Sequence, residues 1–220
     1  MLVVLQSFVL AFGALLPLIN PLGSALLFLG IVGDAPPEVF RQLARKVAFS
    51  TVLFLLIVEL AGAALLTFFG ISLPVVQFAG GLVVAAMGWQ LLNEQTKNEA
   101  AAKTQTAEDN SGPLEDKIFY PLTFPITAGP GCIVVTGTLV AHASRYATVQ
   151  NVLAHLGIAL AIVGLGVLIW FSYAYAPRIT QKIAPQTVHG ILRVIAFVLL
   201  CIGVQISWNG LEMMLRAMPK

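Results

Sequence analysis

The chain interrupts its first apolar run, residues 1–33, with the sequence Pro17-Leu18-Ile19-Asn20-Pro21-Leu22-Gly23-Ser24. An interior proline removes a helical hydrogen bond at a cost of about 3 kcal/mol or more, and the residue before a proline is pushed away from helical angles. At 1.5 Å per residue, an unbroken helix over 4–31 would be about 40 Å long, against a hydrocarbon core of roughly 30 Å. We therefore predict a discontinuous first helix.

The composition is that of an integral membrane protein. Of the 220 residues, 58% are hydrophobic and 10% are charged, whereas soluble domains carry about 25% charged residues. Long charge-free runs, read together with turn signals, predict an all-α fold with six transmembrane helices. The predicted spans are 4–31, 45–69, 73–93, 118–141, 151–175 and 191–212.

A second interruption of the same kind lies 108 residues after the first. It is Pro125-Ile126-Thr127-Ala128-Gly129-Pro130-Gly131-Cys132 in the fourth span, and it aligns with the first proline and the glycine of 17–24. The third and sixth spans match more weakly, at an offset of 115 residues, through Gly88-Trp89-Gln90 and Gly203-Val204-Gln205. Three spans per half is an odd number, so the second half must be inverted. This 3+3 inverted repeat, with the first and fourth helices discontinuous, is typical of secondary transporters.

The predicted domains are a first three-helix repeat (1–93), a flexible acidic cytoplasmic linker (94–117) and a second, inverted three-helix repeat (118–220). Cytoplasmic loops carry an excess of Lys and Arg. The first, third and fifth loops, with the adjoining helix ends, hold nine of the twelve basic residues: Arg41, Arg45, Lys46, Lys97, Lys103, Lys117, Arg178, Lys182 and Arg193. We therefore predict a multi-pass protein of the bacterial inner membrane with the N- and C-termini in the periplasm.

The two interruptions together predict a binding site near the bilayer midplane. A single proline is most often only a kink, but matched interruptions in two halves favour a transporter site beside a polar cavity. Unpaired N–H groups at the start of each following half-helix, around Gly23-Ser24-Ala25 and Gly131-Cys132-Ile133, favour a carboxylate. Open carbonyls just before the breaks, near 16–19 and 124–127, accept an ammonium group. The predicted substrate-binding residues are Asn20, Pro21, Gly23, Ser24, Thr127, Ala128, Gly129, Pro130, Gly131 and Cys132. None is charged, so a small neutral amino acid fits best.

Other polar residues in the spans have less specific roles. Glu59 is the only acid inside a span; a carboxylate at that depth costs at least about 2.5 kcal/mol, so we consider it for proton coupling or for a bond to a neighbouring helix. Possible cavity-lining residues are Gln90, Gln205 and Asn209. Bonding between helices is the alternative for Gln90 and Gln205. We expect interfacial positions for His142, His155 and His189, which lack metal-ligand spacing, and for Trp89, Trp170, Tyr173, Tyr175 and Trp208.

The motifs resemble those of the MarC family, six-span proteins also called the small neutral amino acid transporter family. The resemblance covers nearly the whole chain except the linker, and it rests on Asn20-Pro21-Leu22-Gly23, Ala128-Gly129-Pro130-Gly131, Phe69-Gly70-Ile71-Ser72-Leu73-Pro74 and Asn209-Gly210. It implies membership of the LysE-like exporter superfamily, an inner-membrane location and transport of glycine- or alanine-sized amino acids. It also implies that seven residues of the first two motifs surround the substrate: Asn20, Pro21, Gly23, Ala128, Gly129, Pro130 and Gly131.

The preferred function is therefore secondary transport of a small neutral amino acid by alternating access, without a cofactor or a metal and with possible coupling to H⁺ or Na⁺. Alternatives are an exporter of drugs or other metabolites, a channel, an integral membrane enzyme and a thiol-redox transporter. The repeat partner of Cys132 is Ser24, which disfavours a dithiol relay. The spans contain neither His-Glu-x-x-His nor paired aspartates, the motifs expected for intramembrane proteolysis. We therefore predict that the protein is not an enzyme. We expect the protein to interact with the lipid bilayer and with its substrate, and not with nucleic acid. The sequence does not predict an oligomeric state.

Overall fold

The computed structural model describes residues 1–97, 114–143, 148–178 and 185–217. These ranges contain helices and connecting loops and no strand. The helices are α1 (Leu2–Ile19), α2 (Pro21–Val32), α3 (Pro37–Phe68), α4 (Leu73–Lys97), η1 (Ile118–Thr127), α6 (Pro130–Ala143), α7 (Thr148–Ala174) and α9 (Pro185–Arg216). Of the predicted linker, residues 98–113 lie outside the described part of the chain.

Four segments are long and apolar enough to cross a membrane: Leu2–Val32, Leu73–Asn93, Thr148–Ala174 and Arg193–Arg216. A fifth is obtained if η1 and α6, which are bent by 66° at their junction, are taken as one span. The second predicted span, 45–69, falls almost entirely within the 32-residue helix α3. An all-helical membrane protein is thus confirmed, whereas the total of six spans and the inverted repeat stay predictions.

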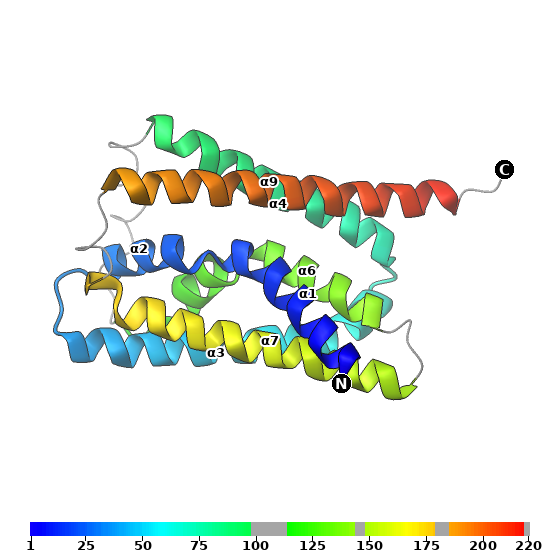
Figure 1. Ribbon diagram of the computed structural model, residues 1–220, viewed down its shortest axis with the longest axis horizontal. Coiled ribbons are helices and arrows are strands. Elements are labelled where there is room, and N and C mark those ends of the chain that lie inside the picture. The colour runs from blue at the N-terminus through cyan, green and yellow to red at the C-terminus, as the bar shows by residue number, and fades with distance from the viewer. Residues whose placement is uncertain (98–113, 144–147, 179–184, 218–220) are drawn as a thin grey trace.

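The helices form two groups (Figure 1). α4 and α9 lie side by side as a long pair, while α1, α2, α3, η1, α6 and α7 form the second group. In that second group, α7 packs against both α1 and α3, and α6 connects it to α4. The start of α1 and the last turns of α9 lie toward the same end of the molecule, which we call the termini face.

Glycines allow α4 and α9 to approach to backbone contact. A Cβ atom added at Gly203 would lie 2.2 Å from the backbone nitrogen of Ala85, and one added at Gly88 would lie 2.5 Å from that of Leu200. Small residues bring membrane helices together in this way. The two contacts correspond to each other at the offset of 115 residues that relates the third and sixth spans. At this offset Gly88 matches Gly203, and Ala85 matches Leu200. The pair therefore has the reciprocal contacts of a local two-fold axis.

Apolar side chains cover the outside of the bundle. Phe49, Leu60, Val167 and Val204 are more than half exposed, an arrangement that a soluble monomer avoids over large areas. Polar side chains such as Ser24, Glu59 and Thr127 are buried instead. This distribution fits a chain whose solvent is lipid.

Candidate functional site

The first helix is broken at Asn20. Its backbone is left-handed (φ 44°, ψ 66°), and it is the only non-glycine residue with positive φ in the described ranges. Asparagine is one of the few residues that tolerate this conformation. The Asn20 Oδ1 atom accepts a hydrogen bond from the backbone N–H of Gly23 at 3.2 Å, and Pro21 occupies the first position of α2, where its missing N–H costs nothing. Asn20 thus ends α1 and caps α2.

The prediction of unpaired amides beyond the breaks is wrong for three of the six positions that it named, namely Gly23, Ser24 and Cys132. Besides the capped Gly23, Ser24 donates its N–H to the Asn20 carbonyl at 2.9 Å, and Cys132 donates its N–H to the Gly129 carbonyl at 2.9 Å. The reason is local capping, which satisfies donors that would otherwise be open. One acceptor loses its helical partner at the first break, because Pro21 has no N–H to offer to the carbonyl of Pro17, four residues earlier.

The second break has a different construction. In η1 the bonds reach back five residues, as from the N–H of Ala128 to the carbonyl of Thr123 at 2.8 Å and from Thr127 Oγ1 to the carbonyl of Leu122 at 2.5 Å. Phe124, which precedes Pro125, has an extended backbone (φ −124°, ψ 126°), as expected for a residue before proline. The chain then turns by 66° into α6.

Tyr173, near the end of α7, joins the two breaks. Its hydroxyl lies 2.7 Å from Thr127 Oγ1 of the second break, and its ring contacts α2, the helix that follows the first break. The ring is completely buried and stacks on Phe28 of α2 with 4.5 Å between ring centroids. The prediction of an interfacial anchor is therefore wrong for Tyr173, because a position near a helix end does not tell which face the side chain occupies.

We expect Tyr173→Phe to lower the free energy of unfolding by about 1 kcal/mol, the net value of a typical hydrogen bond. The loss is limited because Thr127 Oγ1 keeps a partner, the carbonyl of Leu122, to which it donates. Thermal unfolding of the purified protein should show a decrease of about 2–4 °C. Tyr175→Phe removes a hydroxyl from the same end of α7 and is the control; equal stabilities of the two variants would contradict the bridging role.

A cavity of about 360 Å³ lies beside the first break. The walls come from α1, α2, α4, α9 and the end of η1, and the lining residues with polar side chains are Asn20, Ser24 and Gln90. Among the residues described as lining it, none is charged and none is aromatic. The structure thus places a small, neutral and partly polar cavity at the interrupted helix.

The predicted binding residues divide between the cavity and the protein interior. Asn20, Gly23 and Ser24 line the cavity, and Pro21 lines a second, mostly apolar cavity of about 380 Å³ that Asn20 also borders. Pro130 is exposed, whereas the other predicted residues of the second break are buried: Thr127, Ala128, Gly129, Gly131 and Cys132. From the second interruption, it is Ile126 that reaches the cavity.

Glu59 has a specific partner that sequence reasoning missed. Its Oε1 atom lies 2.5 Å from Nδ1 of His155; Glu59 is 2% exposed and His155 30% exposed. The two residues come from the packed helices α3 and α7, 96 positions apart, so no local pattern connects them. His155 is therefore more than the interfacial residue that its position near a span end predicts.

The remaining predicted polar residues lie elsewhere. Gln205 Nε2 donates to Asn209 Oδ1 at 2.9 Å along α9, and both residues are exposed. Asn209 borders a separate cavity near the termini face. Cys132 is buried and Cys201 is exposed. Within the described ranges, no group of three or more His, Cys, Asp or Glu residues is arranged to hold a metal ion.

The interrupted helices belong to a chain whose relatives are membrane proteins. The family described as "MarC family integral membrane protein" matches residues 5–215. This chain belongs to the MarC family. It is 30% identical over 201 residues to the inner membrane protein MarC of Escherichia coli O1:K1, with 90% of each chain covered. The same identity and coverage apply to the inner membrane protein MarC of Escherichia coli K12 and of Shigella flexneri.

No solved structure matches this MarC family chain. Its apolar helices and its relatives agree that it is a multi-pass protein of the inner membrane. The orientation of the termini stays a prediction from the distribution of Lys and Arg.

Proposed function

We propose that this MarC family protein is a secondary transporter of small neutral amino acids of the glycine and alanine type, related to the LysE-like exporters. The substrate binds as a zwitterion in the cavity at the first break and reaches the two sides of the membrane by alternating access. The observation that carries the proposal is a helix broken within the protein beside a cavity with polar but uncharged walls. Discontinuous helices mark substrate sites in many transporters.

The cavity has groups for both charges of a zwitterion. Pro17 and Asn20 line it, and the Pro17 carbonyl, without a helical donor, can accept the ammonium group. Asn20 and Gln90 have carboxamide N–H donors for the carboxylate, and the N-terminus of α2 adds the positive end of a helix dipole. The carboxamides of Asn20, at the start of α2, and of Gln90, on α4, thereby replace the unpaired backbone amides of two half-helices that the sequence predicts as carboxylate ligands.

The cavity favours a small substrate over a drug. Its volume of about 360 Å³ is near the lower end of the range for ligand pockets, roughly 300–1,000 Å³. Drug-sized ligands also depend on aromatic walls, which the described lining residues do not supply. A substrate with a charged side chain would need a counter-charge, and none borders the cavity among those same residues.

Counterflow in liposomes tests the proposal, with labelled glycine and alanine for the preferred class and labelled drugs or other metabolites for the alternative. Gly23 borders the cavity, so Gly23→Leu should fill it and reduce saturable uptake to the level of protein-free liposomes. Gly30 lies on the same helix with open space around an added Cβ, so Gly30→Leu should keep wild-type uptake. Normal uptake by an inserted Gly23→Leu protein would contradict the site.

Proton coupling in this proposal takes place at the Glu59–His155 pair. Glu59→Gln keeps the shape and a hydrogen-bonding group but removes the exchangeable charge. We expect uptake driven by an imposed pH gradient to fall at least about tenfold, while exchange of labelled for unlabelled alanine is retained. An unchanged response to the pH gradient, or dependence on an imposed sodium gradient alone, would exclude Glu59 as the coupling residue.

A further inference from the structure

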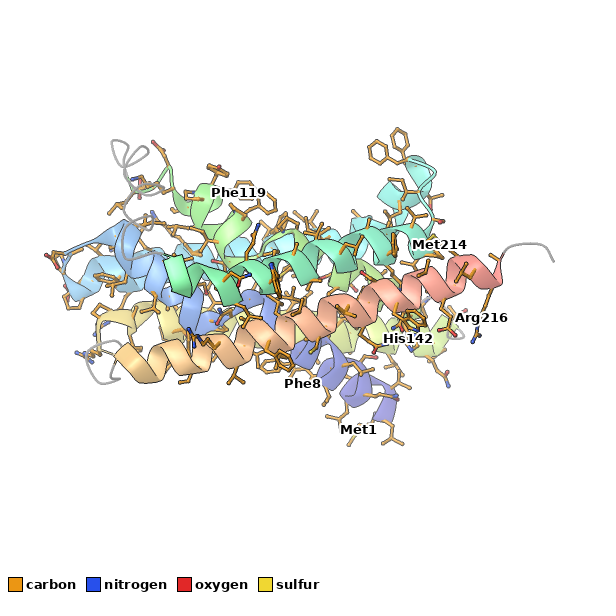
Figure 2. All side chains as sticks on the ribbon, turned by 90° about the horizontal axis from the view of Figure 1, so that it is seen from above. Met1, Phe8, Phe119, His142, Met214 and Arg216 are labelled. Carbon is orange, nitrogen blue, oxygen red and sulfur yellow. The ribbon has the colours of Figure 1, made fainter. Side chains whose placement is uncertain are left out.

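A cavity of about 450 Å³ lies between α1, α4, α6 and α9, toward the termini face. Figure 2 shows His142, at the end of α6, beside the last turns of α9, which carry Met214. The other polar residues around this cavity are Gln77, Thr138 and Asn209. None of these residues takes part in the site at the first break.

Two residues that border this cavity each have a buried side-chain oxygen atom without a hydrogen-bond partner. Gln77 is 7% exposed, and its Oε1 atom is buried without a partner; the same is true of Thr138 Oγ1. Buried polar atoms in native proteins are nearly always paired, so each exception calls for an explanation such as a ligand or water. The two residues lie on different helices, α4 and α6, and border the same cavity.

This cavity and the one at the first break are related in their construction. Each is bordered by a half-helix that follows a break, α2 in one case and α6 in the other, and both are bordered by α1, α4 and α9. Gln77 precedes Gln90 by thirteen positions on α4, which corresponds to about 20 Å along the helix. The two cavities thus lie at different depths in the protein.

A tight contact near the second break lies between these depths. A Cβ atom added at Gly131 would lie 2.6 Å from Leu18 Cδ2 and 2.9 Å from Val84 Cγ2. Leu18 is also a wall of the cavity at the first break, and Val84 lies between Gln77 and Gln90 on α4. The close approach of α1, α4 and α6 at Gly131 therefore separates the two cavities in this conformation.

We propose that the cavity at Gln77 and Thr138 is a second substrate site, on the termini side of the Leu18–Gly131–Val84 contact, where Gln77 Oε1 and Thr138 Oγ1 receive the ammonium group of the amino acid. The inference rests on the transport function proposed above. A carboxamide oxygen is an acceptor only, and a hydroxyl can accept as well, so this pair suits a cation-bearing head group. Asn209 uses Oδ1 to accept from Gln205, which leaves its amide N–H groups for the carboxylate.

The test uses liposomes with uniformly oriented protein, in which unlabelled alanine is varied on one face at a time during counterflow. Gln77→Leu and Thr138→Val should each raise the half-saturating alanine concentration on the termini face by about tenfold, the effect of one hydrogen bond to a charged group. The value on the opposite face should change less than about twofold. Thr136→Val is the matched control: Thr136 lies on α6, is buried with an unpartnered Oγ1, and is outside the cavity.

Three outcomes overturn the second site in distinguishable ways. In the first outcome, the wild-type protein shows saturable counterflow, and Gln77→Leu and Thr138→Val have the wild-type half-saturating alanine concentration on both faces. This result refutes the second site and is compatible with the transport proposal. Equal effects of Thr136→Val and Thr138→Val show that a buried hydroxyl matters for packing and not for the ligand. Wild-type liposomes that exchange neither glycine nor alanine refute the transport proposal and the second site together.

Discussion

Gly203→Ala is expected to lower the free energy of unfolding by about 1–3 kcal/mol, or to prevent folding altogether, although it adds a single methyl group. The new Cβ would lie 2.2 Å from the Ala85 nitrogen and 2.7 Å from the Gly81 carbonyl oxygen. Both obstacles are backbone atoms of α4, so no side chain can rotate away. The whole of α9 has to move outward, which weakens the most extensive helix contact in the described part of the molecule.

Thermal unfolding of purified protein, together with the yield of monodisperse protein in detergent, measures this effect. Gly88→Ala should behave alike, because its Cβ would meet the equivalent backbone atoms of Leu200 and Ala196 on α9. Gly137→Ala is the control, since an added Cβ there meets no atom within 4 Å and alanine favours a helix by about 1 kcal/mol over glycine. Wild-type stability of Gly203→Ala would contradict the close packing of α4 and α9.

Asn20→Ala is expected to cost about 2 kcal/mol or more and to abolish transport. Two effects add: loss of the helix cap, about 0.5–2 kcal/mol, and a left-handed backbone that alanine adopts at a cost of about 1–3 kcal/mol. The variant also removes the carboxamide that borders the cavity. The decrease should be visible in thermal unfolding and in alanine counterflow.

Asn20→Gly separates the two roles of this residue. Glycine adopts positive φ readily and replaces asparagine at a cap at a cost of only a few tenths of a kcal/mol. Stability should therefore stay near the wild-type value while transport is still lost. A fully active Asn20→Gly protein would show that the carboxamide does not bind the substrate.

The sequence predicts what depends on local covalent chemistry. Pro17, Pro21 and Pro125 limit the backbone wherever they occur. The structure has its interruptions close to them in the chain, at Asn20 and between η1 and α6, although Pro17 itself lies inside α1. The helical class and the long apolar segments follow from composition and hydropathy in the same direct way. An asparagine followed by proline is also a recognisable helix start, so the cap at Asn20 was accessible to sequence reasoning.

Tertiary packing determines the features of the site that the sequence does not predict. Tyr173 is fully buried between the two breaks, although its place near the end of α7 predicts the membrane interface. Glu59 and His155 meet because α3 and α7 pack together. The cavity at Gln77 and Thr138 likewise depends on the arrangement of four helices. No periodicity along one helix contains this information.

The central claim is that a small neutral amino acid binds beside the interrupted first helix. An experimental structure of the full chain in lipid, determined with saturating alanine, tests it most directly. The account predicts a chain break at Asn20 and alanine in the adjoining cavity, within hydrogen-bonding distance of Asn20 and Gln90. A continuous helix through residues 17–24, or lipid in the cavity with no amino acid bound there, would contradict it.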